Sequence, residues 1–317
     1  MKTDYLRVSV TDRCNLQCVY CHPLGGCELI DRKEILRLEE IRRIVELFSY
    51  CGIRKVRLTG GEPLIRRNIV YLIKQLSGIK GIEELSLTTN GVLLASLAQE
   101  LKDAGLQRIN ISVDSTDRKS YKEITGFDLL SEVTKGIYKA LEVGLKPVKI
   151  NSVILKGINV SQILPLAEMS FHLPVAVRFI EYCPTNQYTK PASGYMPNHE
   201  LRKVIEHEFG PISFVFIGTA NGPASYFKIR NAAGTIGFIN SRSSSFCHDC
   251  NRLRLTSDGK VKPCLYSSQY YDIKELIRSS ADDKDILRLL RKILCEKNNY
   301  TKLNSVINEF YMQKVGG

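Results

Sequence analysis

The chain has 317 residues, of which 44% are hydrophobic and 25% charged, ordinary values for a globular protein of one large or two smaller domains. No stretch approaches the roughly 20 uninterrupted apolar residues that cross a bilayer, and no apolar leader precedes the first predicted strand, so we expect a soluble, cytoplasmic protein without a membrane partner. Lysine and arginine number 45 against 33 acidic residues, and this formal net charge of +12 suggests an anionic partner, although a basic protein without one is an alternative.

Six short runs rich in β-branched and apolar residues predict strands in the first two thirds of the chain. They are residues 6–11, 55–60, 84–89, 108–115, 148–155 and 176–182. Amphipathic patterns between these runs predict helices. In residues 38–52 an apolar face recurs at helical spacing and Gly52 ends the helix, and residues 93–106 repeat this design.

The alternation of strands and helices predicts parallel β–α–β units with right-handed crossovers. Because no Gly-x-Gly-x-x-Gly pattern follows the first strand, six such units favour an α/β fold of the partial (β/α)6, TIM-like barrel type over a dinucleotide-binding sheet. A polar loop at 185–200 then leads to a short helix at 199–208 and hairpin-like strands at 225–241. We expect a barrel domain over residues 1–215, a smaller C-terminal module over 216–317, and ligands at the carboxyl ends of the strands.

Three cysteines follow the first predicted strand at gaps of three and two residues: Cys14, Cys18 and Cys21. Clustered cysteines in a reducing compartment indicate metal ligands or catalytic thiols rather than disulfides. A structural zinc site normally has four protein ligands, whereas a 4Fe-4S cluster held by three cysteines keeps one iron open to an outside ligand. The spacing therefore favours an iron–sulfur cluster, with a zinc site or a redox pair as the alternative.

This spacing, with the aromatic Tyr20 before the last cysteine, resembles the signature of radical S-adenosylmethionine (SAM) enzymes. In these enzymes the open iron binds SAM, whose cleavage supplies a 5′-deoxyadenosyl radical. The run Leu-Thr-Gly-Gly-Glu-Pro at 58–63 ends the second predicted strand, and the resemblance implies that it seats the methionine part of SAM, although such a run alone is more often a turn. The SAM contacts that the resemblance implies are Tyr20, Gly60, Gly61, Glu62, Asn90, Ser112 and Cys183.

A second group of three cysteines lies in the C-terminal part of the chain, with the spacing C-x2-C-x13-C: Cys247, Cys250 and Cys264. One interpretation is a zinc site completed by His248 or by another cysteine. Because His248 lies between the two paired cysteines, a second 4Fe-4S cluster with an open iron is favoured. Arg252 and Arg254 follow directly, lie on the same side of an extended strand, and can bind an anion there.

Six blocks of the chain resemble, in order, those of the GTP 3′,8-cyclase family, whose members start molybdenum cofactor biosynthesis. The blocks are YLRVSVTDRCN (5–15), RLTGGEPLIRR (57–67), LTTNG (87–91), RFIE (178–181), FCHDCNRLRLT (246–256) and the terminal Gly316-Gly317. Together they span essentially the whole chain. The resemblance implies a lyase reaction in which the deoxyadenosyl radical takes hydrogen from C3′ of GTP and the C3′ radical attacks C8, giving 3′,8-cyclo-7,8-dihydro-GTP.

The resemblance also implies how the substrate is held. Contacts with GTP are implied for Arg7, Arg57, Thr88, Lys149, Arg178, Arg252, Leu253 and Arg254. Any one of these cations alone is more often a solvated surface charge, but cations on apolar strands are costly to bury without an anion. The guanine is implied to bind the open iron of the second cluster, and the tail Gly316-Gly317 to reach into the active site.

Several partners follow from the same resemblance. An external one-electron donor and the downstream cyclic pyranopterin monophosphate synthase, which accepts the product, are implied, and we expect a monomer or homodimer. The chain departs from the family at His22 and Cys183, where methionine is usual and which both flank the expected SAM site. Cys27, close behind the first group, is an alternative ligand, but the first group already matches the family spacing and is favoured.

Two other functions fit parts of the pattern. One is a radical SAM enzyme with an auxiliary cluster that modifies a peptide or another nucleotide, although peptide-modifying members usually carry more C-terminal cysteines. The other is an iron–sulfur or zinc protein that binds nucleic acid through its basic surface. Because the basic residues are dispersed and have no interleaved aromatic residues, we expect no nucleic-acid partner.

Overall fold

The structure of the chain is a computed structural model. It describes residues 3–22, 28–183, 194–216, 222–243, 250–279, 281–298 and 312–315. Some residues singled out in the sequence lie outside this part of the chain: Cys27, Cys247, His248, Gly316 and Gly317.

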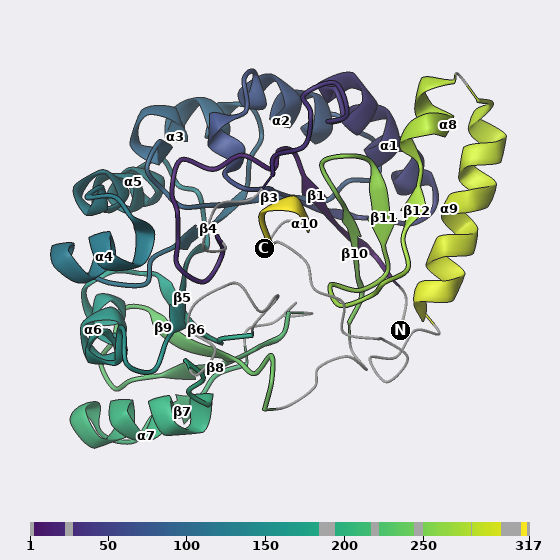
Figure 1. The fold of residues 1–317 in the computed structure, drawn as a ribbon. Coiled ribbons are helices and arrows are strands. Elements are labelled where there is room, and N and C mark those ends of the chain that lie inside the picture. The colour runs from purple at the N-terminus through teal and green to yellow at the C-terminus, as the bar shows by residue number, and fades with distance from the viewer. Residues whose placement is uncertain are drawn as a thin grey trace.

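Six parallel strands form the centre of one sheet, at the positions predicted from the sequence (Figure 1). They are β1 (Tyr5–Ser9), β2 (Lys55–Thr59), β3 (Glu84–Thr89), β4 (Arg108–Ser112), β5 (Val148–Ile154) and β6 (Ala176–Glu181). The helices between them are α1 (Leu38–Tyr50), α2 (Ile69–Ser77), α3 (Leu94–Asp103), α4 (Arg118–Thr125), α5 (Leu130–Glu142) and α6 (Ile163–His172), with short 3₁₀ turns η1 (Pro63–Ile65) and η2 (Val160–Gln162). The predicted alternation of strand and helix is confirmed.

The C-terminal part of the chain adds strands to both edges of this sheet. At one edge β10 (Arg252–Leu255) runs parallel to β1, and at the other β9 (Thr235–Ile239) runs parallel to β6. The outer strands are antiparallel: β11 (Lys260–Lys262) and β12 (Tyr271–Asp272) beyond β10, and β8 (Ala224–Lys228) and β7 (Ser213–Phe214) beyond β9.

The sheet curves strongly but stays open among the described residues (Figure 1). Its strand order is β12-β11-β10-β1-β2-β3-β4-β5-β6-β9-β8-β7. This confirms the predicted partial barrel. The domain boundary predicted at residue 215 stays a prediction, since the sheet itself runs through segments on both sides of it.

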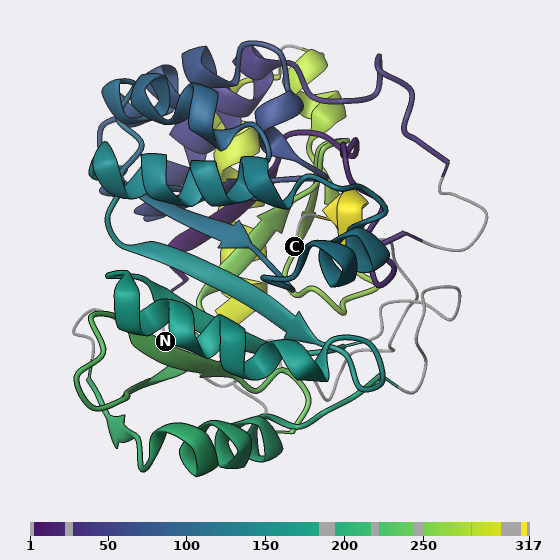
Figure 2. The same ribbon diagram turned by 90° about the vertical axis from the view of Figure 1, so that its left-hand side faces the viewer.

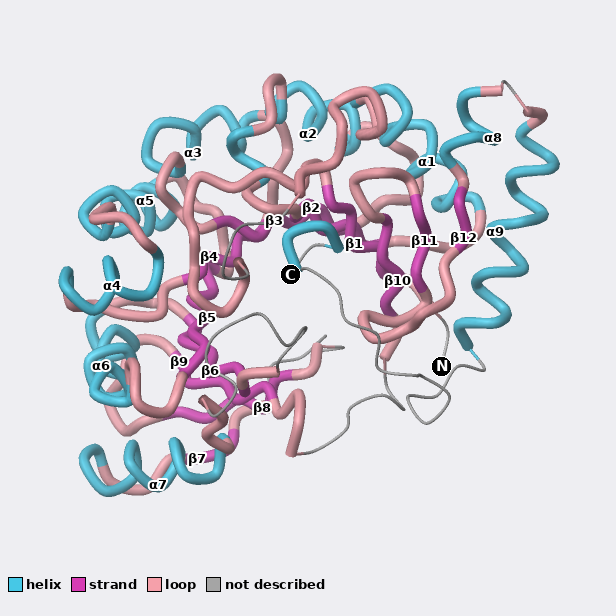
Figure 3. The backbone as a smooth tube through the Cα atoms, in the orientation of Figure 1, coloured by secondary structure: helices cyan, strands magenta, loops and turns pink. Residues whose placement is uncertain are grey.

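Helices cover the outer face of the curved sheet (Figure 3). On α1, the predicted apolar face is buried, with Ile41, Ile44 and Phe48 fully inaccessible to solvent. Because strand side chains alternate, residues such as Leu6 and Val8 of β1 join this outer core while Tyr5 and Arg7 face the interior of the barrel. The interior is therefore the polar side of the sheet. The remaining long helices are α7 (Asn198–Phe209) and α9 (Asp283–Asn298).

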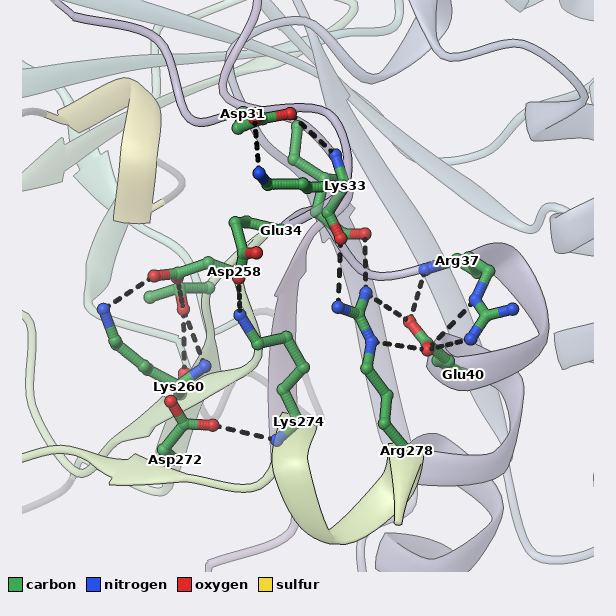
Figure 4. Close-up of polar contacts among 12 residues, drawn as sticks. Asp31, Lys33, Glu34, Arg37, Glu40, Asp258, Lys260, Asp272, Lys274 and Arg278 are labelled. Carbon is green, nitrogen blue, oxygen red and sulfur yellow. Dashed lines mark hydrogen bonds and ion pairs between the residues drawn. The ribbon is translucent and has the colours of Figure 1, made fainter. Parts of the chain in front are cut away.

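Ion pairs attach the short helix α8 (Lys274–Arg278) to the loop at 31–37 and to the first turn of α1, as Figure 4 shows. The Arg278 guanidinium donates to a carboxylate oxygen of Glu40 at 2.9 Å and to the carbonyl oxygen of Lys33 at 3.0 Å. Lys274 pairs with Glu34 in the same network. The C-terminal strands are thus joined to the N-terminal part of the barrel by side chains as well as by the sheet.

The last described helix, α10 (Met312–Val315), lies over the opening of the barrel, on the side where the central strands end (Figures 1 and 2). Val315 is buried there. Across the described ranges, the structure contains no helix with the length and apolar character required to span a bilayer.

Candidate active site

The first cysteine group lies on the loop that follows β1, at the carboxyl ends of the parallel strands. Two backbone hydrogen bonds dock this loop against the end of α4: Gln17 N donates to Thr125 O at 2.9 Å, and Val19 N to Ile124 O at 3.0 Å. The amides of Cys21 and His22 both donate to Cys18 O at 2.9 Å, which closes a tight turn. All three thiols are half-buried on this one loop.

The surroundings of these thiols disfavour a free thiolate. Burial, with a smaller contribution from Glu62, raises the pKa of Cys14 to about 11. Burial also raises the pKa of Cys18 well above its ordinary value, with Cys21 and Asp114 adding to the shift. A metal that binds here must therefore displace the thiol protons.

The donor set fits an iron–sulfur cluster better than a single ion. Within the part of the chain that the structure describes, no group of three or more His, Cys, Asp or Glu side chains could hold one metal ion. The loop after β1 offers three soft sulfur donors spread along eight residues, Cys14 to Cys21. Soft thiolates select zinc or iron–sulfur, and three of them suit a cube with one iron left open.

The Gly-Gly-Glu-Pro loop packs directly against the cysteine loop. Gly61 N donates to Thr11 O, and Glu62 N to Arg13 O, both at 2.8 Å. A Cβ atom at Gly61 would lie 2.1 Å from Arg13 O, and one at Gly60, whose φ is +151°, would lie 2.5 Å from Thr11 O. Both glycines are therefore required for the close approach of these two backbones. Their predicted contact with SAM stays a prediction.

The Glu62 carboxylate joins the ends of β2 and β3. It is 1% exposed and accepts hydrogen bonds from Leu64 N at 2.9 Å, Thr89 Oγ1 at 2.7 Å and Asn90 N at 2.7 Å. Burial raises the pKa of Glu62 to about 7, against these hydrogen bonds. The Asn90 side chain extends this network to the cysteine loop. Its Nδ2 donates to Asn15 Oδ1 at 2.7 Å and lies 3.8 Å from Cys14 Sγ.

Asp114 is a residue of this site that the sequence analysis missed. Its carboxylate accepts the Tyr20 hydroxyl at 2.5 Å and Val153 N at 2.7 Å, so it holds the cysteine loop to β4 and β5. Burial raises the pKa of Asp114 to about 6. The available signal was an acidic residue at the carboxyl end of the strand predicted over residues 108–115. Ser112, predicted for SAM, is the last residue of β4, beside Asn151 of β5 in the sheet register.

A pocket rich in cations lies at the opposite end of the barrel interior. Its described lining includes the first residue of several strands, such as Tyr5, Lys55, Glu84, Arg108 and Arg252, so it opens at the amino ends of the strands. Among the described lining residues, Glu84 is the one with a carboxylate. Seven others carry a cationic side chain: Arg7, Lys55, Arg57, Arg108, Lys149, Arg178 and Arg252. These cations therefore do not lie at the carboxyl ends of the strands, where we expect ligands, because their inward-pointing positions are near the strand starts.

Neutral groups hold several of these cations in place. Arg178 donates to Asn110 Oδ1 at 2.9 Å and to Asn151 Oδ1 at 2.5 Å. Arg57 donates to Ser86 Oγ at 3.2 Å and lies over the ring of Tyr5. Such partners orient a guanidinium group without neutralising its charge, so Arg57 and Arg178 remain available to an anion. Lys55 and Arg108 are instead paired with the carboxylates of Asp4 and Glu84.

The pKa of Lys149 reflects the excess of positive charge in the pocket. Its ammonium nitrogen lies 5.5 Å from the centre of the Tyr226 ring. Burial, followed by repulsion from Arg178, Arg108 and Arg57, lowers the pKa of Lys149 to about 6. Burial and the neighbouring arginines also lower the pKa of Arg7. An anion in this pocket would reverse these shifts.

The structure brings together five of the eight predicted nucleotide contacts in this pocket: Arg7, Arg57, Lys149, Arg178 and Arg252. Arg254 is in register with Arg7, and Thr88 accepts a hydrogen bond from Asn110 at 3.3 Å. The Leu253 side chain packs in the hydrophobic core instead. Lining residues that the sequence analysis missed include Lys55, Arg108 and Tyr226, which point inward from their strands like the predicted ones, and Asn251, which directly precedes β10.

One member of the second cysteine group, Cys250, borders this pocket. Cys250 lies just before Asn251 and Arg252, both of which line the pocket. Burial alone would raise the pKa of the Cys250 thiol, but Arg252 and Lys297 lower it to about 7. Cys264 follows β11, and Cys247 and His248 lie outside the described residues.

Cys183, predicted as a SAM contact, lies near this second group. Its sulfur accepts the Tyr266 hydroxyl at 2.7 Å, and Tyr266 is two residues after Cys264. The end of β6 and the chain after β11 thus approach each other across the barrel interior. The predicted contact of Cys183 with SAM stays a prediction.

Known proteins share both the sequence and the fold of this chain. Residues 8–169 match the Radical SAM superfamily, and residues 175–303 match the family Molybdenum Cofactor Synthesis C. The GTP 3′,8-cyclase of Pelotomaculum thermopropionicum is 42% identical over 99% of this chain and 97% of its own length. That of Desulforamulus reducens is 43% identical over 93% of this chain and 91% of its own length.

Among solved structures, Streptococcus suis SuiB bound to S-adenosylmethionine superposes with a TM-score of 0.67 at 19% identity. The match covers 98% of this chain and 71% of SuiB. At this identity the likeness concerns the fold alone.

Proposed function

Since this chain belongs to the GTP 3′,8-cyclase family of radical SAM enzymes, we propose that it converts GTP into 3′,8-cyclo-7,8-dihydro-GTP. Formation of this product, with a new bond between C3′ and C8, is the first step of molybdenum cofactor biosynthesis. The family predicted from the sequence blocks is confirmed. The observation that carries the choice of substrate is the cationic pocket at the amino ends of the strands.

The pocket suits a triphosphate. Seven cationic side chains face one carboxylate among its described lining residues, and such an excess is costly inside a barrel without an anion. We assign the phosphates to this pocket. The proposed GTP contacts are Arg7, Arg57, Thr88, Lys149, Arg178, Arg252 and Arg254, with Leu253 contributing only backbone groups.

The first cysteine group is proposed to hold the cluster that binds SAM. When bound, a 4Fe-4S cluster and SAM supply a 5′-deoxyadenosyl radical, and both cofactors belong to the superfamily that the chain matches. The proposed ligands are Cys14, Cys18 and Cys21, which the hydrogen bonds to α4 hold in one loop. Tyr20, Gly60, Gly61, Glu62, Asn90, Ser112 and Cys183 are proposed SAM contacts, and the packing of the glycine loop against the cysteine loop supports Gly60, Gly61 and Glu62.

A second 4Fe-4S cluster is proposed on Cys247, Cys250 and Cys264. Cys250 supports this assignment, because it lies next to pocket residues and because Arg252 and Lys297 favour its thiolate form. With the phosphates among the pocket cations, the guanine can extend toward the open iron of this cluster. The nucleotide would then lie between the two cysteine groups.

The remaining partners are proposals from the family. An external one-electron donor supplies reducing equivalents, and cyclic pyranopterin monophosphate synthase takes up the product, both in the cytoplasm. The enzyme acts as a monomer or homodimer. The tail Gly316-Gly317 is proposed to enter the active site, which the position of α10 over the barrel opening supports (Figure 1).

Deuterium transfer tests this function. Reconstituted protein is incubated without oxygen with SAM, dithionite and GTP deuterated at C3′. We expect deuterium in 5′-deoxyadenosine and a product with the mass of 3′,8-cyclo-7,8-dihydro-GTP. Unlabelled 5′-deoxyadenosine together with unchanged GTP would reject GTP as the substrate, and the same assay with other nucleoside triphosphates would then define the specificity.

A further inference from the structure

A lysine side chain contacts one of the proposed ligands of the second cluster. Lys297, near the end of α9, is 5% exposed, and its ammonium nitrogen lies 3.6 Å from Cys250 Sγ. This distance is within the range of a hydrogen bond to sulfur. Lys297 is not among the described residues that line the cationic pocket, so its contact is with the cysteine and not with the proposed phosphate site.

The rest of α9 holds Lys297 in this position. Ile286, Leu290, Ile293 and Leu294 of the helix are buried in the hydrophobic core, and α9 packs against α1. The helix therefore forms a fixed support for the side chain at its end. Another lysine of α9, Lys292, is exposed to solvent, in contrast to Lys297.

A buried ammonium group needs an anionic partner. Lysine normally carries its charged end to solvent, and burying it unpaired is strongly unfavourable. Among the described residues, no carboxylate lies within ion-pairing distance of Lys297. Among the described residues the Cys250 sulfur is its polar contact, so a thiolate, or the anionic cluster that thiolates hold, can supply the negative charge that its burial needs.

The first cysteine group has surroundings of the opposite kind. The side chain that approaches Cys14 Sγ is the neutral amide of Asn90, at 3.8 Å. The buried carboxyl groups of Glu62 and Asp114 lie close by and disfavour further negative charge there. Reduction of a cluster adds negative charge, so cations and hydrogen bonds at the sulfur atoms raise its reduction potential.

We propose that Lys297 is a positioning residue that raises the reduction potential of the second cluster above that of the first by donating a hydrogen bond to Cys250. This inference rests on the proposed presence of the second cluster. It gives the two clusters different electron affinities from protein charges alone. An electron is then more stable on the cluster beside the nucleotide than on the cluster beside SAM.

The test is a redox titration of the reconstituted holoenzyme, followed by electron paramagnetic resonance. The signal that changes on GTP addition identifies the second cluster. In Lys297→Met we expect the equilibrium constant for reduction of that cluster to fall at least tenfold, which is about 59 mV for a one-electron couple, with the first cluster unchanged. Lys297→Arg keeps a cationic donor and should retain most of the wild-type value.

Lys292→Met is the matched control, because Lys292 is an exposed lysine of the same helix and pairs with Glu296 at 3.9 Å. It should move neither potential. Iron counts on the same samples show whether each variant keeps both clusters, and Lys297→Gln gives a polar, neutral replacement if Lys297→Met loses one. Equal potentials in wild type and in the Met or Gln variant would overturn the role of Lys297 while leaving the two-cluster proposal intact. A wild-type protein with a single cluster would overturn both.

Discussion

The two cysteine groups lie in surroundings of opposite charge. The first group lies at the carboxyl ends of the strands beside the buried acids Glu62 and Asp114, and the pKa of Cys14 is raised to about 11. In the second group Cys250 borders a cationic pocket, and Arg252 and Lys297 lower the pKa of Cys250 to about 7. Two groups of three cysteines each thus lie in different electrostatic environments.

The comparison shows how one barrel can separate two tasks. An acidic, hydrogen-bonded loop suits a cofactor that is itself cationic, such as the sulfonium of SAM. A cationic pocket suits a nucleotide triphosphate and stabilises additional negative charge on a neighbouring cluster. Position along the same parallel strands, at one end or at the other, decides which kind of site each cysteine group joins.

Replacing one cysteine from each group should have the largest effect and should separate the two tasks. Cys18→Ser is expected to lose one of two clusters, about half of the iron, and all reductive cleavage of SAM. Cys264→Ser should lose a similar share of the iron, retain SAM cleavage and form no cyclic product. Cys295→Ser, at an exposed cysteine, serves as the control. Loss of SAM cleavage in Cys264→Ser would contradict the separation.

The glycine loop should be needed only by the first group. In Gly61→Ala the new methyl carbon would lie 2.1 Å from Arg13 O, so the cysteine loop must shift. We expect this variant to lose the first cluster and keep the second, measured as iron content and as retention of the GTP-sensitive signal. Gly78→Ala, where the closest atom is 3.7 Å away, should behave as wild type. If Gly61→Ala kept a full complement of iron, the close packing of the two loops would be unimportant.

The cationic pocket should determine affinity for GTP and not for SAM. Arg57→Met removes one charge that faces the proposed triphosphate, and a hydrogen bond to a charged group contributes about 1.5–3 kcal/mol, so GTP binding should weaken roughly 10- to 100-fold. Isothermal titration calorimetry with GTP and with SAM gives both affinities. Lys119→Met, at an exposed lysine, is the control. Equal loss of SAM and GTP binding would instead indicate general damage to the barrel.

The pH dependence of GTP binding should report Lys149. The pKa of Lys149 is lowered from 10.5 to about 6 in the ligand-free protein, and bound phosphates should raise it. Above pH 6 binding then takes up a proton, so affinity falls as pH rises, by at most about tenfold per pH unit. Calorimetry in buffers with different heats of ionisation measures this proton uptake. In Lys149→Met the part of the uptake that comes from Lys149 should be lost.

The same shift affects the ligand-free protein. Because the folded-state pKa of Lys149 lies below its unfolded value, the unfolded chain binds more protons between pH 6 and 10.5. This group therefore makes stability rise with pH across that window. Thermal unfolding of wild type and Lys149→Met over this range should show a smaller increase in the variant. Identical pH profiles would place the Lys149 charge in solvent.

The smallest expected effect concerns the tie between Tyr20 and Asp114. Tyr20→Phe removes a buried hydrogen bond of 2.5 Å and leaves the Asp114 carboxylate with one partner fewer, a loss of about 1–3 kcal/mol. We expect the first cluster to be lost several-fold faster in the presence of a chelator, with the second unaffected. Tyr138→Phe, at an exposed tyrosine on α5, controls for the substitution itself.

The strands and helices could be predicted from the sequence because each buries an apolar face with a clear period. The extension of the sheet could not. β1 pairs with β10, which joins Tyr5 to Arg252, and β6 pairs with β9. Such long-range pairings leave no local pattern in the sequence, because the residues of a strand do not indicate which edge of the sheet it joins.

The site was predicted in its residue types more than in its geometry. The cysteine spacings, the glycine loop and several arginines carry local patterns, and the pocket collects Arg7, Arg57 and Arg178. These arginines meet at one end of the barrel because each occupies an inward-pointing position near the start of its strand. The sequence pattern alone did not show this. Asp114 and Lys297 were missed because each acts through tertiary contacts with residues distant in the sequence: Asp114 accepts from Tyr20 and Val153, and Lys297 lies 47 residues from Cys250.

The most direct test of the account is anaerobic electron paramagnetic resonance of the reduced, reconstituted protein with SAM and GTP added separately. We expect about eight iron atoms per chain, four for each proposed cluster, and two signals. SAM should change only the signal that Cys18→Ser removes, and GTP only the signal that Cys264→Ser removes. A single signal, or one signal that responds to both compounds, would contradict two clusters with separate ligands.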